Sequence, residues 1–262
     1  MLFLALCIIT CVQMRAADGD TFTANTQEGI VMSFKIISEI DKTVQVGGSY
    51  ASSISKSTSG AVTIPQQIEK SGVKYTVVSI GYHAFFFCEK LTSVTIPNSV
   101  KNIGEEAFNF CGGLTSVNIP SSVTDIGEDA FGSCYNLTSI TIPPSVTSIG
   151  EAAFYGCGNL TTMNVDERNT KYDSRNQCNA IIETSTNMLI SGFSTTIIPN
   201  SVTSIANYAF AYLNNSSMTS IVIPSSVKKI GNSSFRWCSK LTSVKIPNSV
   251  ESIGDYAFES CI

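Results

Sequence analysis

The sequence predicts a β-rich solenoid, which is a stack of short coils built from one repeated unit. The segment LTSVTIPNSVKNIGEEAFNFCGG (91–113) recurs as LTSVNIPSSVTDIGEDAFGSCYN (114–136) and LTSITIPPSVTSIGEAAFYGCGN (137–159), which places equivalent residues 23 positions apart. The unit returns at 218–240 and 241–262. At its start, apolar and polar residues alternate as in a strand with one buried face.

A repeat of 23 residues falls within the range of about 20–29 that is typical of leucine-rich repeats. One unit cannot bury its apolar side alone, whereas stacked units share a continuous core. We therefore expect a right-handed leucine-rich-repeat solenoid over residues 73–262. Each coil should hold a strand at TSVTIP, a second extended segment near SVxxI and a short helical turn after the glycine. Gly104 and its equivalents should supply a turn that a Cβ would strain.

The inward side chains should form columns through the stack. Val94 and Ile96 should point inward and Thr95 outward. A phenylalanine column is expected at 85, 108, 131, 154, 210, 235 and 258. A cysteine follows three residues later in six coils, at 88, 111, 134, 157, 238 and 261. Parallel side chains in a row do not easily reach the disulfide dihedral of about 90° or a tetrahedral zinc geometry. These cysteines are therefore expected to be buried free thiols, with no metal and no cofactor.

Three segments depart from the regular unit. Residues 160–192 form an irregular coil, and residues 18–72 do not repeat. Within 18–72, GIVMSFKII and KTVQVG are predicted to form a β-hairpin, an N-terminal β cap that covers the open end of the stack. Residues 1–17 hold an apolar run shorter than the roughly 20 residues of a membrane span, which indicates a secretory signal peptide.

Secretion to the medium or the cell surface follows from that signal peptide, with no membrane insertion once it is removed. Cys7 and Cys11 leave lipoprotein anchoring as an alternative. Leu6 and Thr10 disfavour it, because a small residue usually precedes the lipidated cysteine.

The chain offers little for catalysis or nucleic-acid binding. Its net charge is −4, and no basic patch is visible, which argues against nucleic acid as a partner. The single histidine, His83, is expected to face solvent. No nucleophile elbow, zinc-binding or phosphate-binding motif appears. The carboxylates Asp166, Glu167, Asp173 and Glu183 are the candidates for two-carboxylate glycosidase chemistry, but we expect no enzyme.

Binding has more candidates. Outward strand positions form polar ladders, for which Thr95, Asn118 and Thr141 are the proposed binding residues; the alternative is a solvated sheet. A second candidate is an aromatic row two residues after the phenylalanine column, which consists of Phe87, Phe110, Tyr212 and Trp237. An exposed row of this kind is typical of a contact surface, and local packing is the alternative. A third candidate is the basic insertion with Arg168, Lys171, Tyr172 and Arg175, which could also be a plain loop.

The unit L-T-S-V-T-I-P-x-S-V-x-x-I-G-x-x-A-F-x-x-C resembles the BspA-like, or Treponema-type, leucine-rich-repeat family over residues 73–262. The segment NTKYDS (169–174) is similar to a variant coil of that family. The resemblance implies a secreted or cell-surface protein, because the family's members are mostly such proteins of host-associated bacteria and some parasitic protists. Several are implicated in adhesion to host matrix proteins and to other cells.

The resemblance brings no shared catalytic residues. It favours a non-catalytic binding or adhesion protein with an extracellular protein or glycan ligand, a host matrix protein among the candidates. A carbohydrate-binding module and a structural spacer are the alternatives.

Overall fold

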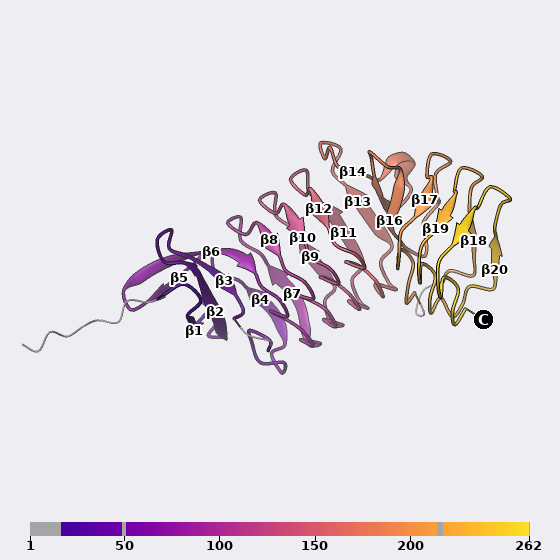
Figure 1. Ribbon diagram of the computed structural model, residues 1–262. Coiled ribbons are helices and arrows are strands. Elements are labelled where there is room, and N and C mark those ends of the chain that lie inside the picture. The colour runs from indigo at the N-terminus through magenta and orange to yellow at the C-terminus, as the bar shows by residue number, and fades with distance from the viewer. Residues whose placement is uncertain (1–16, 49–50, 214–216, 262) are drawn as a thin grey trace, which may run out of the picture.

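The computed structural model describes residues 17–48, 51–213 and 217–261. Residues 1–16 of the expected signal peptide lie outside these ranges. Within them, no helix has the length and apolar character needed to cross a bilayer. The chain forms an elongated, curved stack in which the strands of successive coils follow one another from the indigo end to the yellow end (Figure 1).

The first sheet joins antiparallel strands at the N-terminal end to parallel strands of the coils. Strand β1 pairs antiparallel with β2, β2 pairs antiparallel with β3, and β3 pairs in parallel with β6. From β6 the ladder continues in parallel through β8, β10 and β12, with paired residues 23 apart, as in Asn102↔Asp125. The strands of this sheet are β1 (Thr21–Asn25), β2 (Val31–Ser38), β3 (Thr43–Val46), β5 (Gln67–Lys70), β6 (Val73–Ile80), β8 (Asn102–Ile103), β10 (Asp125–Ile126) and β12 (Ser148–Ile149).

The second sheet lies across the core from the first and is parallel throughout. Its order is β13-β11-β9-β7-β4. Its strands are β4 (Gly60–Thr63), β7 (Leu91–Thr95), β9 (Ser116–Asn118), β11 (Ser139–Ile142) and β13 (Thr162–Val165). In β7 the burial alternates, with Val94 buried and Thr95 exposed, as the sequence pattern predicts.

Two further sheets serve the C-terminal coils. The larger has the order β14-β15-β16-β17-β19-β21, and β18 pairs with β20 in the other. Their strands are β14 (Tyr172–Asp173), β15 (Ala180–Glu183), β16 (Met188–Gly192), β17 (Ser204–Ile205), β18 (Ser220–Val222), β19 (Lys229–Ile230), β20 (Ser243–Lys245) and β21 (Ser252–Ile253). Both sheets of the regular coils are therefore interrupted at the irregular coil.

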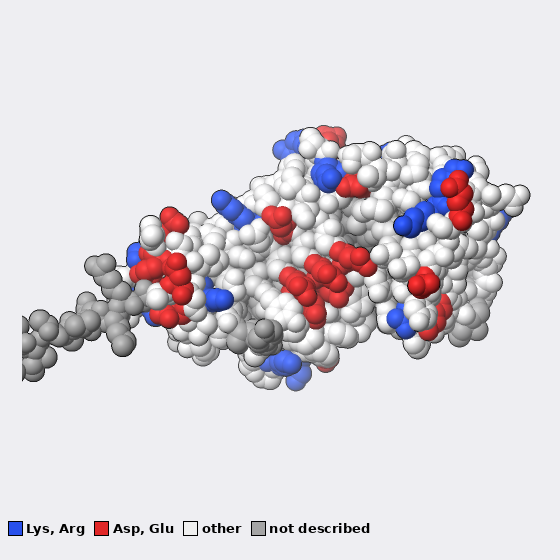
Figure 2. All heavy atoms as spheres, in the orientation of Figure 1, with Lys and Arg blue, Asp and Glu red and all other residues white. Residues whose placement is uncertain are grey.

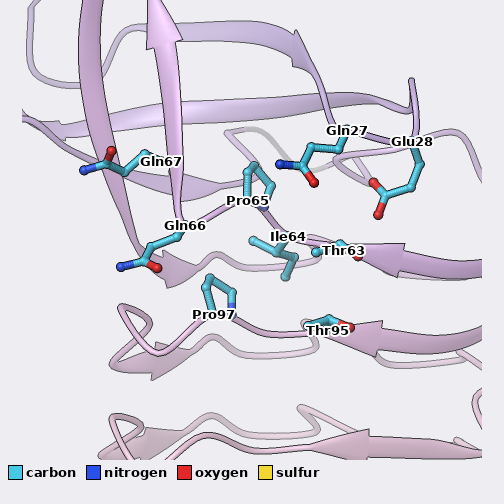
Figure 3. Close-up of a pocket in the computed structure, with 9 residues that line it drawn as sticks. All are labelled: Gln27, Glu28, Thr63, Ile64, Pro65, Gln66, Gln67, Thr95 and Pro97. Atoms are coloured by element: carbon cyan, nitrogen blue, oxygen red, sulfur yellow. The ribbon is translucent and has the colours of Figure 1, made fainter.

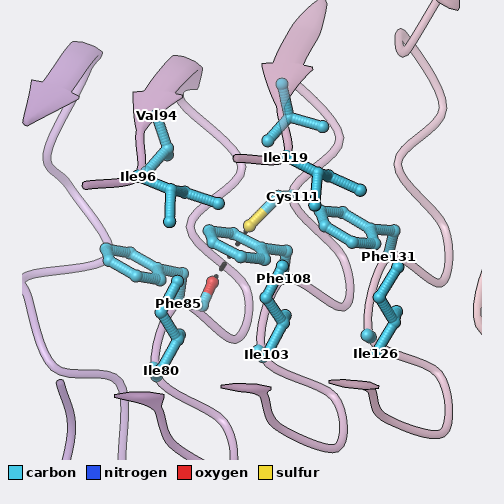
Figure 4. Close-up of a cluster of buried hydrophobic side chains, with 14 of the residues drawn as sticks. Ile80, Phe85, Val94, Ile96, Ile103, Phe108, Cys111, Ile119, Ile126 and Phe131 are labelled. Carbon is cyan, nitrogen blue, oxygen red and sulfur yellow. Dashed lines mark hydrogen bonds between the residues drawn. The ribbon is translucent and has the colours of Figure 1, made fainter. Parts of the chain in front are cut away.

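The expected phenylalanine column runs through the interior (Figure 4). Ring centroids of Phe85 and Phe108 are 4.9 Å apart, those of Phe108 and Phe131 5.2 Å, and those of Phe131 and Phe154 5.5 Å, with planes within 6° of parallel. A second stack begins at Phe210. The buried residues form two clusters that divide at the irregular coil.

The cysteine column has a structural role that its spacing did not reveal. All seven cysteines of the described residues are free. The Sγ of Cys111 donates to the carbonyl oxygen of Phe85 at 3.0 Å, and Cys134 and Cys157 repeat this contact one coil further on each time. Burial raises the pKa of Cys157 and Cys238 to about 12. The thiols therefore stay protonated and link adjacent coils.

The prediction of a short helical turn after the glycine is wrong. Glu106 and Phe110 have φ angles of 51° and 59°, in the left-handed region that interrupts an α-helix. The N–H groups of 106, 108 and 110 donate to carbonyls of the next coil, while those of 107, 109 and 111 donate three residues back. The backbone is thus satisfied partly within the turn and partly by the neighbouring coil. Among the described residues the helical element is the 3-10 turn η1 (Arg175–Gln177).

The glycine column has a different cause from the one expected. Gly127 does not adopt a left-handed φ. A Cβ at this position would instead lie 2.5 Å from the backbone nitrogen of Glu105 and 2.6 Å from the carbonyl carbon of Gly104. Glycine is required because adjacent coils approach each other closely at this point.

The irregular coil is attached to its neighbour by side chains. The buried Asn169 donates to the carbonyls of Pro143 and Val146 at 2.8 and 3.0 Å. The hydroxyl of Tyr172 accepts the backbone N–H of Ile149, at the edge of the ladder that ends there. The coil then folds into the antiparallel pair β15–β16.

Candidate ligand-binding surface

The surface built by the turns, at residues 104–112 and their equivalents, is called the turn face here. The irregular coil, residues 160–192, contributes no turn to this face. The N–H of Gly156 donates to the carbonyl of Ala211 at 3.1 Å, and the rings of Tyr155 and Tyr212 lie 5.5 Å apart. Coils 137–159 and 193–217 are therefore neighbours on the turn face.

The predicted aromatic row lies on the turn face but is split into two stacks. Phe87 and Phe110 stack with centroids 4.4 Å apart and planes at 8°. Tyr212 and Trp237 stack with centroids 6.3 Å apart, and Trp237 is 43% exposed. Between the two stacks the same position holds Ser133 and Gly156, which carry no ring.

A hollow of about 400 Å³ fills the gap between the stacks. Phe110 lies at one side, and Tyr155, Tyr208 and Tyr212 contribute to the lining together with the small side chains of Ser133 and Ala152. The Tyr155 ring occupies the space that a Cβ at Gly132 would fill, and its hydroxyl donates to Asn109 Oδ1 at 3.4 Å. The small residues of one coil thus make room for the rings of the next.

Carboxylates border the hollow. Glu128, Asp129 and Glu151 line it, and Figure 2 shows a band of acidic side chains across the middle of the molecule. Burial raises the pKa of Asp129 to about 7, with further contributions from the charges of Glu128, Glu106, Glu105 and Glu151. These acids lie on non-helical turns, so no helix dipole stabilises them.

Comparison with known proteins establishes the family. The model of the BspA type leucine-rich repeat region matches residues 65–181 and 180–262, in six copies. The chain belongs to this family.

The chain is also similar to solved structures of leucine-rich-repeat and surface proteins. This BspA-type chain is similar to the pneumococcal vaccine antigen PcpA, with 20% identity, a TM-score of 0.50 and coverage of 90% of this chain and 72% of that one. A leucine-rich cell surface protein from Faecalibacterium prausnitzii has 24% identity and a TM-score of 0.49, over 92% of this chain and 80% of that one. A leucine-rich repeat protein from Bacteroides ovatus has 25% identity and a TM-score of 0.49, over 88% and 67%. No curated protein matches the chain at a significant level.

The polar strand face of this BspA-type protein is exposed at all three predicted positions, Thr95, Asn118 and Thr141. The neighbouring threonines bond to backbone, as Thr115 Oγ1 does to the Thr92 carbonyl at 3.1 Å. The face is mixed further along the stack. Equivalent positions there hold Ile197 and Val222, which are 77% and 68% exposed, and then the exposed Lys245.

A second hollow, of about 540 Å³, adjoins Thr95. Figure 3 shows Gln27 and Glu28 on the β1–β2 turn facing the segment Thr63–Gln67, with Thr95 and Pro97 on the next coil. Neither hollow could be found from the repeat pattern. The first joins coils with different side chains at the same position, and the second joins a turn of the non-repeating segment 18–72 to the coils.

Three of the four predicted catalytic candidates are held in ion pairs, and the fourth, Glu167, is exposed. Asp166 pairs with Arg168 at 2.8 Å, Glu183 with Lys171 at 2.7 Å, and Asp173 with Arg175 at 2.5 Å. The hydrogen bonds from Arg168 lower the pKa of Asp166 to about 2. The same pairs neutralise the basic insertion, in which Tyr172 is buried.

His83 is not the solvent-facing residue that was expected. Its side chain is only 14% exposed and its Nε2 lies 3.0 Å from Glu106 Oε2. Its ring stacks between Tyr82 and Phe86. Within 17–48, 51–213 and 217–261, no three His, Cys, Asp or Glu side chains are grouped to hold a metal ion.

Asp129→Asn is expected to stabilise the protein at pH 8 by about 1–2 kcal/mol, a value reduced for solvent screening of a partly exposed group. The raised pKa means that the folded state binds more protons than the unfolded chain between about pH 4 and 7. Stability from this group is therefore lost as pH rises through that window. Asparagine tolerates the left-handed φ of 51° at this position.

Urea unfolding at pH 8 and pH 3 measures the effect. The gain should be present at pH 8 and absent below pH 4. Glu167→Gln, at an exposed acid of the irregular coil, serves as the control and should show no gain. A lower stability of Asp129→Asn at pH 8 would contradict the prediction.

Proposed function

We propose that this chain is a non-catalytic binding protein of the cell surface or the secreted fraction, which engages a partner protein through the turn-face hollow. One observation carries the proposal. Tyr155, Tyr208, Tyr212 and Phe110 line a single concave surface, beside the exposed ring of Trp237. Tyrosine and tryptophan are enriched among the residues that dominate binding energy at protein interfaces.

The scaffold supports that role. Stacked coils hold their turns by backbone hydrogen bonds to the next coil, and solenoids of this kind present extended surfaces on a rigid frame. We further propose a signal peptide at 1–17, an N-terminal β cap at 18–72 and a right-handed solenoid of about 23-residue coils at 73–262. Extracellular proteins, host matrix proteins among them, are the partners to test first.

The test is binding of the chain from residue 18 onward to immobilised extracellular-matrix proteins. For a matrix protein that binds, Tyr212→Ala and Trp237→Ala together should weaken binding by about 30-fold or more, since truncating an interface hot spot costs about 2 kcal/mol or more. The matched control is Thr95→Ala with Asn118→Ala on the strand face, which should leave binding unchanged.

If the aromatic variant binds as well as the parent chain and the strand-face variant does not, the strand face is the binding surface and the proposal is wrong. If no matrix protein binds, a role as a structural spacer is favoured over a role in adhesion.

Carbohydrate binding is the second candidate function, and the hollow of Figure 3 favours it. Its lining combines the amide groups of Gln27, Gln66 and Gln67 and the hydroxyls of Thr63 and Thr95 with one carboxylate, that of Glu28. Such donors and acceptors, beside the apolar surface of prolines, suit a polyhydroxylated ligand. A glycan array probed with the parent chain and with Thr95→Ala separates this function from protein binding.

A further inference from the structure

The N-terminal aromatic stack on the turn face already holds a cation. Lys56, from the segment that precedes the first regular coil, places its Nζ 5.2 Å from the centroid of Phe87 and 5.7 Å from that of Phe86. An ammonium group within about 6 Å of a ring face is attracted by the ring quadrupole. The repeat geometry thus shows how its outer aromatic side chains receive a basic one.

The hollow offers the same kind of aromatic surface with added negative charge. Tyr155 and Tyr212 meet edge to face with centroids 5.5 Å apart, and the carboxylates of Asp129 and Glu151 share the lining with them. Glu151 accepts a hydrogen bond from the neutral amide of Asn207 at 3.3 Å. Crowding with other acids is one cause of the raised pKa of Asp129.

Among the described residues that line the hollow, Arg236 is the one basic side chain, and its charge is engaged elsewhere. Its guanidinium pairs with Glu259 and lies 5.6 Å from the Tyr256 ring centroid. The acids at the hollow are therefore not neutralised in the way that Lys171 neutralises Glu183 on the irregular coil.

We propose that the hollow receives a basic side chain, lysine or arginine, carried by an extended segment of a partner protein. The proposal rests on the proposed function and adds the chemistry of the partner to it. The alkyl stem lies against the tyrosine rings, and the charged end reaches the carboxylates at the border. Charge complementarity selects such a segment over an acidic or neutral one.

The probe is a seven-residue acetylated and amidated peptide with lysines at its first, fourth and seventh positions and glycine and serine between them. Its counterpart carries norleucine in place of each lysine, which keeps the stem and removes the charge. Trp237 is the only tryptophan in the sequence and stacks on Tyr212, so its emission reports occupancy. At pH 8, where Asp129 is largely ionised, we expect saturable binding with a Kd on the order of 1 mM or tighter, weakening as salt is raised.

Asp129→Asn with Glu151→Gln should weaken binding of the lysine peptide about tenfold, and Glu167→Gln should leave it unchanged. Each of these substitutions conserves the shape of the side chain, and the thermal unfolding midpoint verifies that each variant is folded. Equal binding of the norleucine peptide, unchanged binding by the double variant, or no saturable change in emission would each overturn the proposal.

The two proposals fail in different ways. If Tyr212→Ala with Trp237→Ala abolishes binding of a matrix protein while Asp129→Asn with Glu151→Gln does not, the hollow is a protein site without selection for a basic residue. If the lysine peptide binds as expected while the aromatic variant still binds the matrix protein, the hollow recognises cations but is not the surface that contacts that protein.

Discussion

Phe131→Ala is expected to lower the free energy of unfolding by about 3–5 kcal/mol, the usual cost of removing a buried aromatic side chain. The Phe131 ring is fully buried and stacks on Phe108 at 5.2 Å and on Phe154 at 5.5 Å. The substitution removes ring contacts on both sides. It also leaves a cavity in a core that neighbouring coils cannot close, because their spacing is fixed by the strand ladders.

Urea unfolding followed by far-UV circular dichroism measures the loss. The control is Phe258→Ala, at a ring that is partly exposed and has one stacking partner in the described chain, Phe235 at 5.1 Å. Its loss should be clearly smaller. Equal losses at the two positions would show that stacking along the column does not set the stability of a coil, contrary to nearest-neighbour behaviour in solenoids.

The columns could be predicted because each coil repeats the same inward residues. Once Phe108 and Phe131 occupy the same place in consecutive units, stacking of the units makes them neighbours, and no finer detail is needed. The turn conformation could not be predicted in this way. Ala107, Phe108 and Cys111 have the spacing of one helix face, and the same spacing serves the observed turn, whose N–H groups donate partly to the next coil.

The candidate site was predictable only in part, for a related reason. Phe110 and Tyr212 occupy the same repeat position and could be found. The position of Tyr155 is held by Asn109 and Gly132 in the two preceding coils, so the repeat does not mark it as aromatic. Its contact with Tyr212 exists because the irregular coil contributes no turn there, which lets Gly156 bond directly to Ala211. The spacing of repeats does not say on which side an inserted coil leaves the stack.

Gly127→Ala is the second substitution with a large expected effect, a loss of about 3 kcal/mol from overpacking. The new Cβ would lie 2.5 Å from the Glu105 nitrogen and 2.6 Å from the Gly104 carbonyl carbon. These are backbone atoms, so no side-chain rotation relieves the contact. The coils must separate, which stretches the ladder bond from the Gly127 N–H to the Ile103 carbonyl, now 2.8 Å.

The matched control is Gly112→Ala. A Cβ there would first meet the Tyr135 ring at 3.2 Å, and a side chain on the surface can yield, so its loss should be below about 1 kcal/mol. Thermal and urea unfolding of the two variants test the difference. Similar losses of stability in both variants would mean that the close approach of adjacent coils is not the reason for glycine in this column.

Ala206 shows why the same column tolerates a methyl group at one place. It is the residue at which the glycine pattern breaks, and it follows the irregular coil instead of a regular one. A hollow of about 310 Å³ adjoins it, lined in part by Ile149, Gly150 and Ile190, so its Cβ has room that Gly127 lacks. Ala206→Gly should therefore change stability by only about 1 kcal/mol, the conformational entropy of glycine. A gain of stability as large as the loss in Gly127→Ala would show that Ala206 is itself strained.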